Sequence, residues 1–336
     1  MAYQNRVLVT GADGFIGSHL VEQLIKKRLN VSALYLYNAH NNIGSLKYLE
    51  KKNLSRVKLI PGDVRDKSLM EEITKNVDVV YHLAALISVP YSYKAPESFF
   101  STNVNGTLNV LQSCMRNSVK KIICTSTSEI YGTALYTPID EEHKIQTQSP
   151  YAASKISADH LIESFAKTYN LPALIARPFN TYGPRQSEKA VIPNIIRQIL
   201  DENCKEIKLG DISTRRDFNY IKDTVEAFIS FSNIKSNKVK FGEAYNFASE
   251  KSYSIEDVIN LLFNISGIKK PIKCDKQRIR PKNSEVKLLE GCAKKFKSIT
   301  KWKSKVDLKQ GLKETFMWME KNKSDILENK KFSYFY

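Results

Sequence analysis

The chain has 336 residues, of which 42% are hydrophobic and 26% charged, an ordinary balance for a soluble globular protein that excludes global disorder and the need for disulfide or metal staples. Its formal net charge is +17, but scattered lysines without arginine clusters or interleaved aromatics disfavour nucleic-acid binding. The sequence shows no secretion signal, no apolar stretch of the roughly 20 residues that span a membrane and no C-x-x-C pair among its five cysteines. We therefore expect a cytoplasmic protein without membrane or metal sites.

Strands and helices are predicted to alternate over about the first half of the chain. Short apolar, β-branched runs predict six strands, at Arg6–Thr10, Val31–Leu36, Val57–Ile60, Val77–Leu83, Ile122–Thr125 and Ala173–Ala176. Apolar residues at helical spacing predict helices between the strands, most clearly at Ser18–Lys27, Pro96–Asn117 and Tyr151–Tyr169. Strict alternation of this kind predicts an α/β fold with a Rossmann-type, doubly wound parallel sheet.

The pattern changes after Pro184, where helix-like segments are separated by short strands and polar loops. The clearest segments are Ile192–Leu200, Ile255–Ser266 and Leu308–Met319. This part of the sequence predicts a smaller, mixed α/β C-terminal lobe. Because alternation resumes near Arg216–Ser232, we expect a first domain of residues 1–185 with 216–248, and a second lobe of residues 186–215 with 249–336.

Three glycines at positions Gly11, Gly14 and Gly17 follow the first predicted strand and open the first predicted helix. The first glycine allows a tight turn, the second lets the backbone approach a pyrophosphate, and the third lets the helix pack on the strand. Phosphates then lie over the helix N-terminus. This pattern in this position predicts dinucleotide binding.

The cofactor's identity is left open by the second predicted strand. An Asp or Glu should follow about 20 residues after the glycines to bind the ribose 2′-OH of NAD, yet residues 31–49 contain neither, and no Arg that would hold the 2′-phosphate of NADP. Asn38 could serve the ribose as donor and acceptor, although Lys47 lies nearby in the sequence. Asp63, after the third strand, is placed to reach the adenine edge. NAD is favoured, and NADP is not excluded.

Two further elements carry reactive side chains. Tyr151 and Lys155 share one face of a predicted helix, and a Tyr base working near pH 7 needs its pKa lowered by about three units, which a nearby ammonium and a positive nicotinamide can supply. Thr127, Ser128 and Glu129 follow the fifth predicted strand, whose C-terminal end faces the ligand crevice of a parallel sheet. A carboxylate there can remove an acidified C–H proton, which simple oxidation would not require.

Taken together, these residues resemble the extended short-chain dehydrogenase/reductase family over nearly the whole chain. The matching segments are TGADGFIGSHL, GDVRD, HLAA, TNVNGTLNVL, TSTSEIYG, SPYAASK, ARPFNTYGPR and RRDFNYIKD. Within that family the sequence is similar to nucleotide-sugar 4,6-dehydratases. Longer strings such as HLAALISVPYSYKAPESFF resemble the NAD-dependent enzymes that act on GDP- or UDP-linked N-acetylglucosamine in bacterial legionaminic acid synthesis.

The resemblance implies roles for the catalytic residues. Tyr151 would be the base at the sugar C4 hydroxyl, Lys155 would hold the cofactor ribose, and Thr127 would bond the C4 oxygen. Glu129 would remove the C5 proton. Ser128 stands where dehydratases of dTDP-glucose carry Asp, so the group that protonates the departing 6-hydroxyl stays open.

The resemblance also implies binding residues and partners. Cofactor contacts would come from Gly11, Gly14, Phe15, Ile16, Gly17, Asn38, Asp63, Val64, Leu83, Ala84, Ala85, Tyr151 and Lys155, and substrate contacts from Ser88, Ser92, Asn180, Arg185, Val191, Arg216 and Arg280. Asn180 and the last two arginines would grip the diphosphate of a nucleotide sugar, bound by the C-terminal lobe. Relatives form homodimers through helices that correspond to Pro96–Asn117 and Tyr151–Tyr169, so a homodimer is expected.

Three other functions remain open. A C4 epimerase shares the Tyr–Lys pair but has no use for a carboxylate at position 129. A UDP-glucuronate decarboxylase shares the Thr-Ser-Glu sequence, but its loops around the sugar acid differ from HLAALISVPYSY. An RNA-binding relative would agree with the positive charge, although such proteins usually lose the Tyr–Lys pair, which is intact in this chain.

Overall fold

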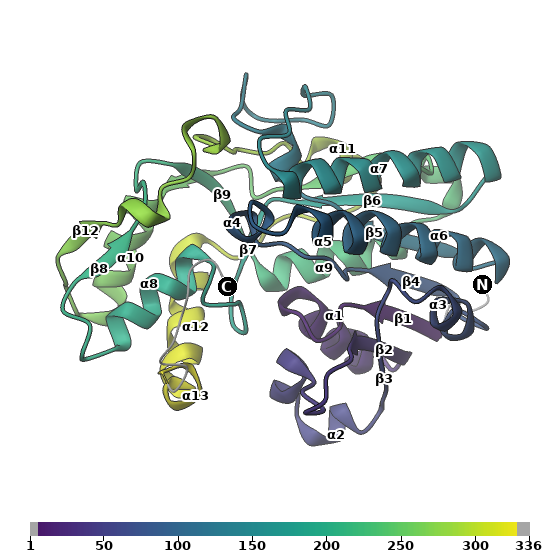
Figure 1. Cartoon of the computed structure of the whole chain (residues 1–336), viewed down its shortest axis with the longest axis horizontal. Coiled ribbons are helices and arrows are strands. Elements are labelled where there is room, and N and C mark those ends of the chain that lie inside the picture. The colour runs from purple at the N-terminus through teal and green to yellow at the C-terminus, as the bar shows by residue number, and fades with distance from the viewer. Residues whose placement is uncertain (1–5, 328–336) are drawn as a thin grey trace.

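The computed structural model describes residues 6–327, and its centre is a parallel sheet of seven strands in the order β10-β6-β5-β4-β1-β2-β3 (Figure 1). The strands are β1 (Arg6–Thr10), β2 (Asn30–Leu36), β3 (Val57–Gly62), β4 (Val79–His82), β5 (Lys121–Thr125), β6 (Ala173–Pro178) and β10 (Ala244–Phe247). The chain therefore runs outward from β1 to one edge and then from β4 to the other, which is the doubly wound arrangement. The predicted Rossmann-type fold is confirmed, with β10 added to the six predicted strands.

Helices cover both faces of this sheet. One face carries α3, α6 and α7, with α6 in contact with both of the others, and the other face carries α1 and α9, which pack together (Figure 1). The helices of this part are α1 (Phe15–Lys26), α2 (Lys51–Leu54), α3 (Lys67–Ile73), α4 (Val89–Ser92), α5 (Pro96–Phe100), α6 (Gly106–Arg116), α7 (Pro150–Tyr169) and α9 (Ile221–Ser232). Of the described residues, no helix is both long and apolar enough to cross a membrane.

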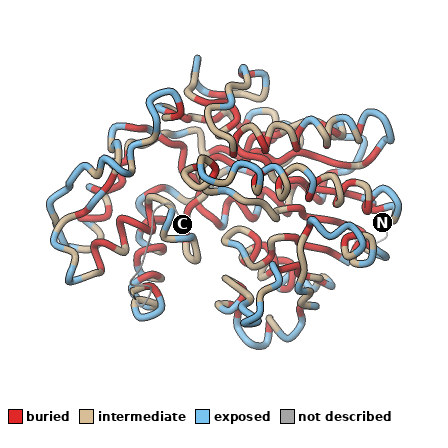
Figure 2. Tube along the Cα trace, viewed as in Figure 1, coloured by how far each residue is buried: buried red, intermediate tan, exposed pale blue. Residues whose placement is uncertain are grey.

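The central strands of the sheet are buried on both faces: every residue of β4 and β6 is buried (red in Figure 2), whereas most of the edge strand β3 is half-buried or exposed. Along β1, Leu8 belongs to the core beneath α6 and α7, whereas Val7 and Val9 belong to the core on the α1 side. Alternate side chains of one strand thus enter two different cores. This explains why the strands read as continuous apolar runs rather than as alternating apolar and polar residues.

The C-terminal part adds small sheets and further helices, most of which lie to the left of the main sheet in Figure 1. A three-stranded sheet in the order β11-β9-β7 joins β7 (Asn180–Tyr182), β9 (Arg215–Tyr220) and β11 (Ser252–Ser254), and β8 (Ile207–Leu209) pairs with β12 (Ile272–Cys274). The helices are α8 (Val191–Leu200), α10 (Ile255–Ser266), α11 (Lys294–Ile299), α12 (Leu308–Lys321) and α13 (Lys323–Leu327). Residues 328–336 of the expected second lobe lie outside the described residues.

The predicted helix Pro96–Asn117 is interrupted by a π-helical segment, Ser101–Asn105, between α5 and α6. Asn103 in this segment is buried. Its amide oxygen accepts from the Leu86 N–H at 2.8 Å, and its amide nitrogen donates to the Leu86 carbonyl at 2.9 Å and to Ser154 Oγ at 2.9 Å. A π-bulge within an α-helix often occurs at a functional site. Here its Asn103 links the loop after β4, through Leu86, to α7, through Ser154.

Asp217 on β9 fastens two distant loops to the small sheet, and its loss gives a stability prediction. Its buried carboxylate accepts from the Ser249 N–H at 2.9 Å and Oγ–H at 2.6 Å, from the Glu250 N–H at 2.9 Å and from the Gly291 N–H at 3.2 Å. In Asp217→Asn an amide NH₂ faces N–H donors, so we expect the free energy of unfolding in urea to fall by about 3 kcal/mol. The control is Asp211→Asn, an exposed acid bonded within its own turn, with a change of about 0.5 kcal/mol or less. Equal losses in both variants would contradict this role.

Candidate active site

The glycine turn between β1 and α1 is closely packed. Gly11 has φ +66°, and a Cβ there would lie 2.7 Å from the Ala84 nitrogen; a Cβ on Gly17 would lie 2.1 Å from the Gly11 carbonyl oxygen. Any larger side chain would therefore force the turn apart. The helix α1 starts at Phe15, followed by Ile16, and Gly14 is its N-cap residue. Because glycine has no side chain, no side chain caps the first turn of this helix. The first amides of α1 are consequently available to a phosphate.

The loop after β4 is held beside this turn by a buried threonine. Thr10 Oγ1 accepts from the Leu83 and Ala84 N–H groups, both at 3.2 Å, and lies 2.8 Å from His82 Nδ1. Burial lowers the pKa of His82 to about 3, so the ring is neutral and serves as a hydrogen-bonding spacer. Leu83 and Ala84 are thereby placed against Gly11, where the resemblance expects residues 83–85 to line the cofactor.

At the other end of the expected cofactor site, the predicted polar residues are already engaged. The Asn38 amide donates to the carbonyls of Leu36 at 3.1 Å and Asn42 at 2.8 Å, and its oxygen accepts from the Asn42 N–H at 2.8 Å. Asp63 forms a salt bridge with Arg65, 2.6 Å from Nη2 to Oδ2, which lowers the pKa of the Asp63 carboxyl. The next residue, Val64, packs in the core beside α6, where it is 4% exposed. Asn38 therefore orders its own turn.

Tyr151 and Lys155 lie one turn apart near the start of α7. Ser149 caps this helix by accepting from the Ala152 N–H at 3.1 Å, and Pro150 occupies its first turn, both of which favour helix initiation. Lys155 Nζ donates to the Thr125 carbonyl at 2.5 Å, which fixes the ammonium at the end of β5. Burial raises the pKa of Tyr151, a hydrogen bond with Thr127 lowers it, and the negative charge of Glu129 raises it again. Additional positive charge is therefore needed before Tyr151 can act as a base.

Thr127, Ser128 and Glu129 lie at the end of β5, in a short 3-10 turn. Thr127 caps this turn, its Oγ1 accepting from the Glu129 N–H at 3.2 Å. The Glu129 carboxylate lies 3.5 Å from Arg280 Nη1. Burial lowers the pKa of the Arg216 guanidinium, whereas the charge of Glu129 raises it and that of Arg280 lowers it. Thr127, Ser128 and Glu129 thus share one site with the two arginines predicted to bind the diphosphate, although residues 129 and 280 are far apart in the sequence.

The other predicted substrate residues are placed differently. Ser92 is fully buried and donates to the Val89 carbonyl at 2.7 Å, while Ser88 caps α4. Arg185 Nη2 donates to Glu22 of α1 at 2.6 Å. Asn180 begins β7 and Val191 begins α8. The structure therefore gives Ser92 and Arg185 partners within the fold, while residues 180 and 191 lie at the starts of a short strand and of a helix.

One group behind the site was missed by the sequence analysis. Asp159, one turn after Lys155 on α7, is 3% exposed. Its Oδ2 accepts from Ser126 Oγ at 2.8 Å and from Arg177 Nε and Nη2 at 3.2 and 3.1 Å. Burial lowers the pKa of Lys155, whereas the Asp159 charge raises it. The i, i+4 spacing of Lys155 and Asp159 could have indicated this pair, but Arg177 is brought in by β6 and only the fold reveals it.

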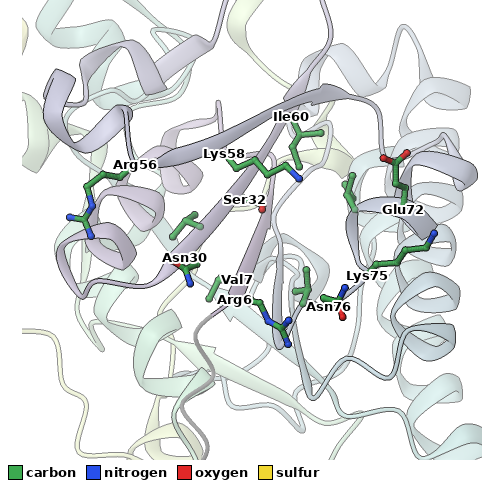
Figure 3. Close-up of a pocket in the computed structure, with 13 residues that line it drawn as sticks. Arg6, Val7, Asn30, Ser32, Arg56, Lys58, Ile60, Glu72, Lys75 and Asn76 are labelled. Carbon is green, nitrogen blue, oxygen red and sulfur yellow. The ribbon is translucent and has the colours of Figure 1, made fainter.

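A separate pocket lies at the opposite ends of the strands. It is lined by residues at the starts of β1, β2 and β3, among them Arg6, Asn30 and Lys58. Figure 3 shows the labelled Arg56 and Lys75 side chains pointing away from each other. These two cations do not converge on one ligand position, and the glycine turn lies at the opposite, C-terminal end of β1. This pocket is therefore not part of the candidate active site.

A parallel sheet with a glycine turn at β1, a Tyr–Lys pair on α7 and polar groups at the tip of β5 defines an enzyme of the dinucleotide-dependent short-chain dehydrogenase/reductase class. The chain belongs to the family described as GDP-mannose 4,6 dehydratase, which matches residues 8–315.

Curated relatives include enzymes of three activities. The chain is 33% identical to a putative UDP-glucose 4-epimerase of Methanocaldococcus jannaschii, over 94% of this chain and 99% of the relative. It is 32% identical to the human dTDP-D-glucose 4,6-dehydratase, over 95% and 91%. It is 31% identical to a UDP-N-acetyl-alpha-D-glucosaminuronate decarboxylase of Bacillus cytotoxicus, over 96% and 100%. These names indicate a family of nucleotide-sugar dehydratases, epimerases and decarboxylases.

Solved structures give the same picture. A point mutant of UDP-glucuronic acid 4-epimerase from Bacillus cereus, in complex with NAD and a fluorinated UDP-glucuronic acid, has a TM-score of 0.85 at 29% identity, covering 94% of this chain and 99% of that one. TunA, an NAD-dependent NDP-hexosamine 5,6-dehydratase of tunicamycin biosynthesis, has a TM-score of 0.82 at 28% identity, covering 94% and 98%. NAD, the cofactor favoured by the sequence, is thus the cofactor named for both of these relatives.

Proposed function

We propose that the protein dehydrates a nucleotide-linked N-acetylglucosamine, carried on GDP or UDP, to its 4-keto-6-deoxy sugar, using bound NAD, in the cytoplasm. The product would enter bacterial nonulosonic acid synthesis, of which legionaminic acid is one example. The observation that carries this proposal is the position of Glu129: it lies in the turn capped by Thr127 at the tip of β5, and its carboxylate is 3.5 Å from Arg280 Nη1. Oxidation and reduction at C4 alone would not require this acid.

The residues of the site fit a dinucleotide. The close contact of Gly11 with Ala84 and the open first turn of α1 suit a pyrophosphate, and Lys155, fixed at the end of β5, suits the nicotinamide ribose. When bound, NAD would supply the redox chemistry, oxidising the sugar at C4 and later reducing it at C6. Its positive ring would also supply the charge that Tyr151 needs to lose its proton.

The first task of the protein is to accept the proton of the C4 hydroxyl. Tyr151 takes this proton in the proposed mechanism, and Thr127 donates a hydrogen bond to the same oxygen. Both side chains are largely buried, at 7% and 8% exposed, so water competes little for the sugar hydroxyl. The resulting 4-ketone acidifies the proton on C5.

The second task belongs to Glu129, which removes the C5 proton as the C6 hydroxyl departs with a proton to form water. Arg280 now faces the Glu129 carboxylate at 3.5 Å. In the proposed complex Arg280 and Arg216 hold the diphosphate, whose two negative charges compete with Glu129 for these cations. Glu129 can then return its own proton to the leaving oxygen, which needs no acid at the position of Ser128.

A second candidate is epimerisation at C4. It is favoured by the similarity to the solved UDP-glucuronic acid 4-epimerase and by the fact that Tyr151, Thr127 and Lys155 are sufficient for oxidation and reduction at one carbon. Decarboxylation of a sugar acid uses the same first oxidation. Each of these reactions leaves a product of different mass or stereochemistry.

The test is incubation of the NAD-loaded protein, in separate reactions, with UDP- and GDP-N-acetylglucosamine and with UDP-N-acetylglucosaminuronic acid, followed by mass spectrometry and NMR. Loss of one water together with a ketone at C4 supports the proposal. An unchanged mass with inverted C4 supports the epimerase, and loss of carbon dioxide from the corresponding uronic acid supports the decarboxylase. Loss of water without a C4 ketone would identify a different dehydratase.

We also propose a homodimer formed through α5, α6 and α7. These helices expose large apolar side chains, namely Phe100 at 40%, Met115 at 36% and Tyr169 at 54%. Exposed apolar side chains on a protein surface often mark an interaction site. A solution mass of one chain would contradict this proposal.

A further inference from the structure

The end of β2 has no acidic residue to accept a hydrogen bond from the adenosine ribose, but the carboxylate of Asp13 reaches that position from another loop. Asp13 belongs to the glycine turn, between Gly11 and Gly14. Its Oδ2 accepts from the N–H of Leu36, the last residue of β2, at 3.3 Å. In a dinucleotide-binding sheet the carboxylate that bonds the ribose 2′-OH lies at this strand end. Asp13, in the loop after β1, therefore places at the end of β2 the carboxylate that the sequence of β2 lacks.

The backbone of Asp13 is also held in place by its neighbours. The Ser45 N–H donates to the Asp13 carbonyl at 2.8 Å, and a Cβ on Gly44, which has φ +56°, would lie 2.6 Å from that same oxygen. The backbone of residues 44–45 thus packs closely on Asp13. The side chain is of intermediate exposure, so it is fixed by the fold and still reachable by a ligand.

Other polar groups near the end of β2 are committed elsewhere. The Asn38 side-chain amide donates two hydrogen bonds and accepts one within its own turn. Lys47 Nζ forms an ion pair with Asp325 of α13 at 3.0 Å. Arg65, after β3, is paired with Asp63. A 2′-phosphate at this position would therefore lie beside the Asp13 carboxylate. The charges of Lys47 and Arg65 are already balanced by their own acidic partners.

We propose that Asp13 determines the choice of cofactor by accepting hydrogen bonds from the adenosine ribose hydroxyls of NAD and repelling the 2′-phosphate of NADP. This inference rests on the proposed use of a nicotinamide dinucleotide and concerns which one is bound. A carboxylate paired with a diol gains charge-assisted hydrogen bonds, whereas a carboxylate beside a phosphate places like charges in contact.

The test is calorimetric titration of the nucleotide-free protein with NAD⁺ and NADP⁺ separately. Wild type should bind NAD⁺ at least about a hundredfold more tightly than NADP⁺. Asp13→Asn, which keeps an acceptor for the Leu36 N–H, should weaken NAD⁺ binding by about tenfold and move the preference toward NADP⁺ by at least about tenfold. Asp13→Ser provides a second variant with the same expected direction. The matched control is Asp201→Asn, whose carboxylate likewise accepts a backbone N–H, from Asn203 at 3.0 Å, and is of intermediate exposure, so both affinities should stay unchanged. Asn38→Ala tests the alternative that Asn38 binds the ribose.

The outcomes separate the two proposals. Wild type that binds neither dinucleotide overturns the proposed function, and with it this inference. Wild type that binds both equally, or Asp13 variants that melt like wild type and keep its ratio, overturn only the role of Asp13. A fall in NAD⁺ affinity confined to Asn38→Ala would also overturn it and assign the ribose to Asn38.

Discussion

Glu129→Gln is expected to oxidise its sugar at C4 and yet release no water. The amide is nearly isosteric with the acid but cannot remove a proton, so elimination should slow by about a thousandfold or more. The first oxidation depends on Tyr151 and Thr127, which the substitution leaves in place. We therefore expect the absorbance of reduced nicotinamide to appear on mixing with substrate and then to persist, while mass spectrometry detects no loss of water.

Solvent exchange locates the blocked step. In deuterated water the wild type should incorporate deuterium at C5, because that proton is removed, whereas Glu129→Gln should not. Glu285→Gln is the matched control: Glu285 faces Arg216 at 3.5 Å and has the same charge, so its loss should affect substrate affinity more than elimination. Full dehydration by Glu129→Gln would assign the base to another residue and remove the main support for a dehydratase.

The sheet was predictable because both of its faces are buried. Runs such as VVYH and IICT carry apolar residues at nearly every position. Because these runs are much shorter than a typical buried helix, their length favours strands. The strand β10, with the sequence AYNF, has no such signal. It is short and contains Asn246, whose buried amide accepts from Tyr131 and donates to the Ile139 carbonyl, a pairing that exists only after folding.

The site was predictable where its residues are close in sequence and only partly where they are not. The spacing of Tyr151 and Lys155 places them on one helix face, and Glu129 follows directly from the end of a strand. The spacing does not reveal where the lysine ammonium points, which is to the Thr125 carbonyl. Nor does any local pattern bring Arg280 to Glu129 or Asp13 to the end of β2, because these contacts depend on loops that meet across the fold.

Tyr151→Phe is expected to abolish the reaction at its first step. Phenylalanine keeps the buried ring, which packs edge-on against Phe99 with centroids 6.2 Å apart, so the fold should be retained. It has no hydroxyl to accept the C4 proton, and turnover should fall by about a thousandfold or more. Unlike Glu129→Gln, this variant should show no reduced nicotinamide and no deuterium at C5.

The pH dependence provides a separate check on Tyr151. Burial raises its pKa and the Glu129 charge raises it further, while only the deprotonated phenolate can act as the base. The rate of C4 oxidation should therefore rise with pH until the tyrosine is ionised in the complex. In Glu129→Gln one raising influence is removed, so the rise should occur at lower pH than in wild type. A shift in the opposite direction would mean that the group controlling oxidation is not Tyr151, and that the carboxylate and the tyrosine do not share one site during catalysis.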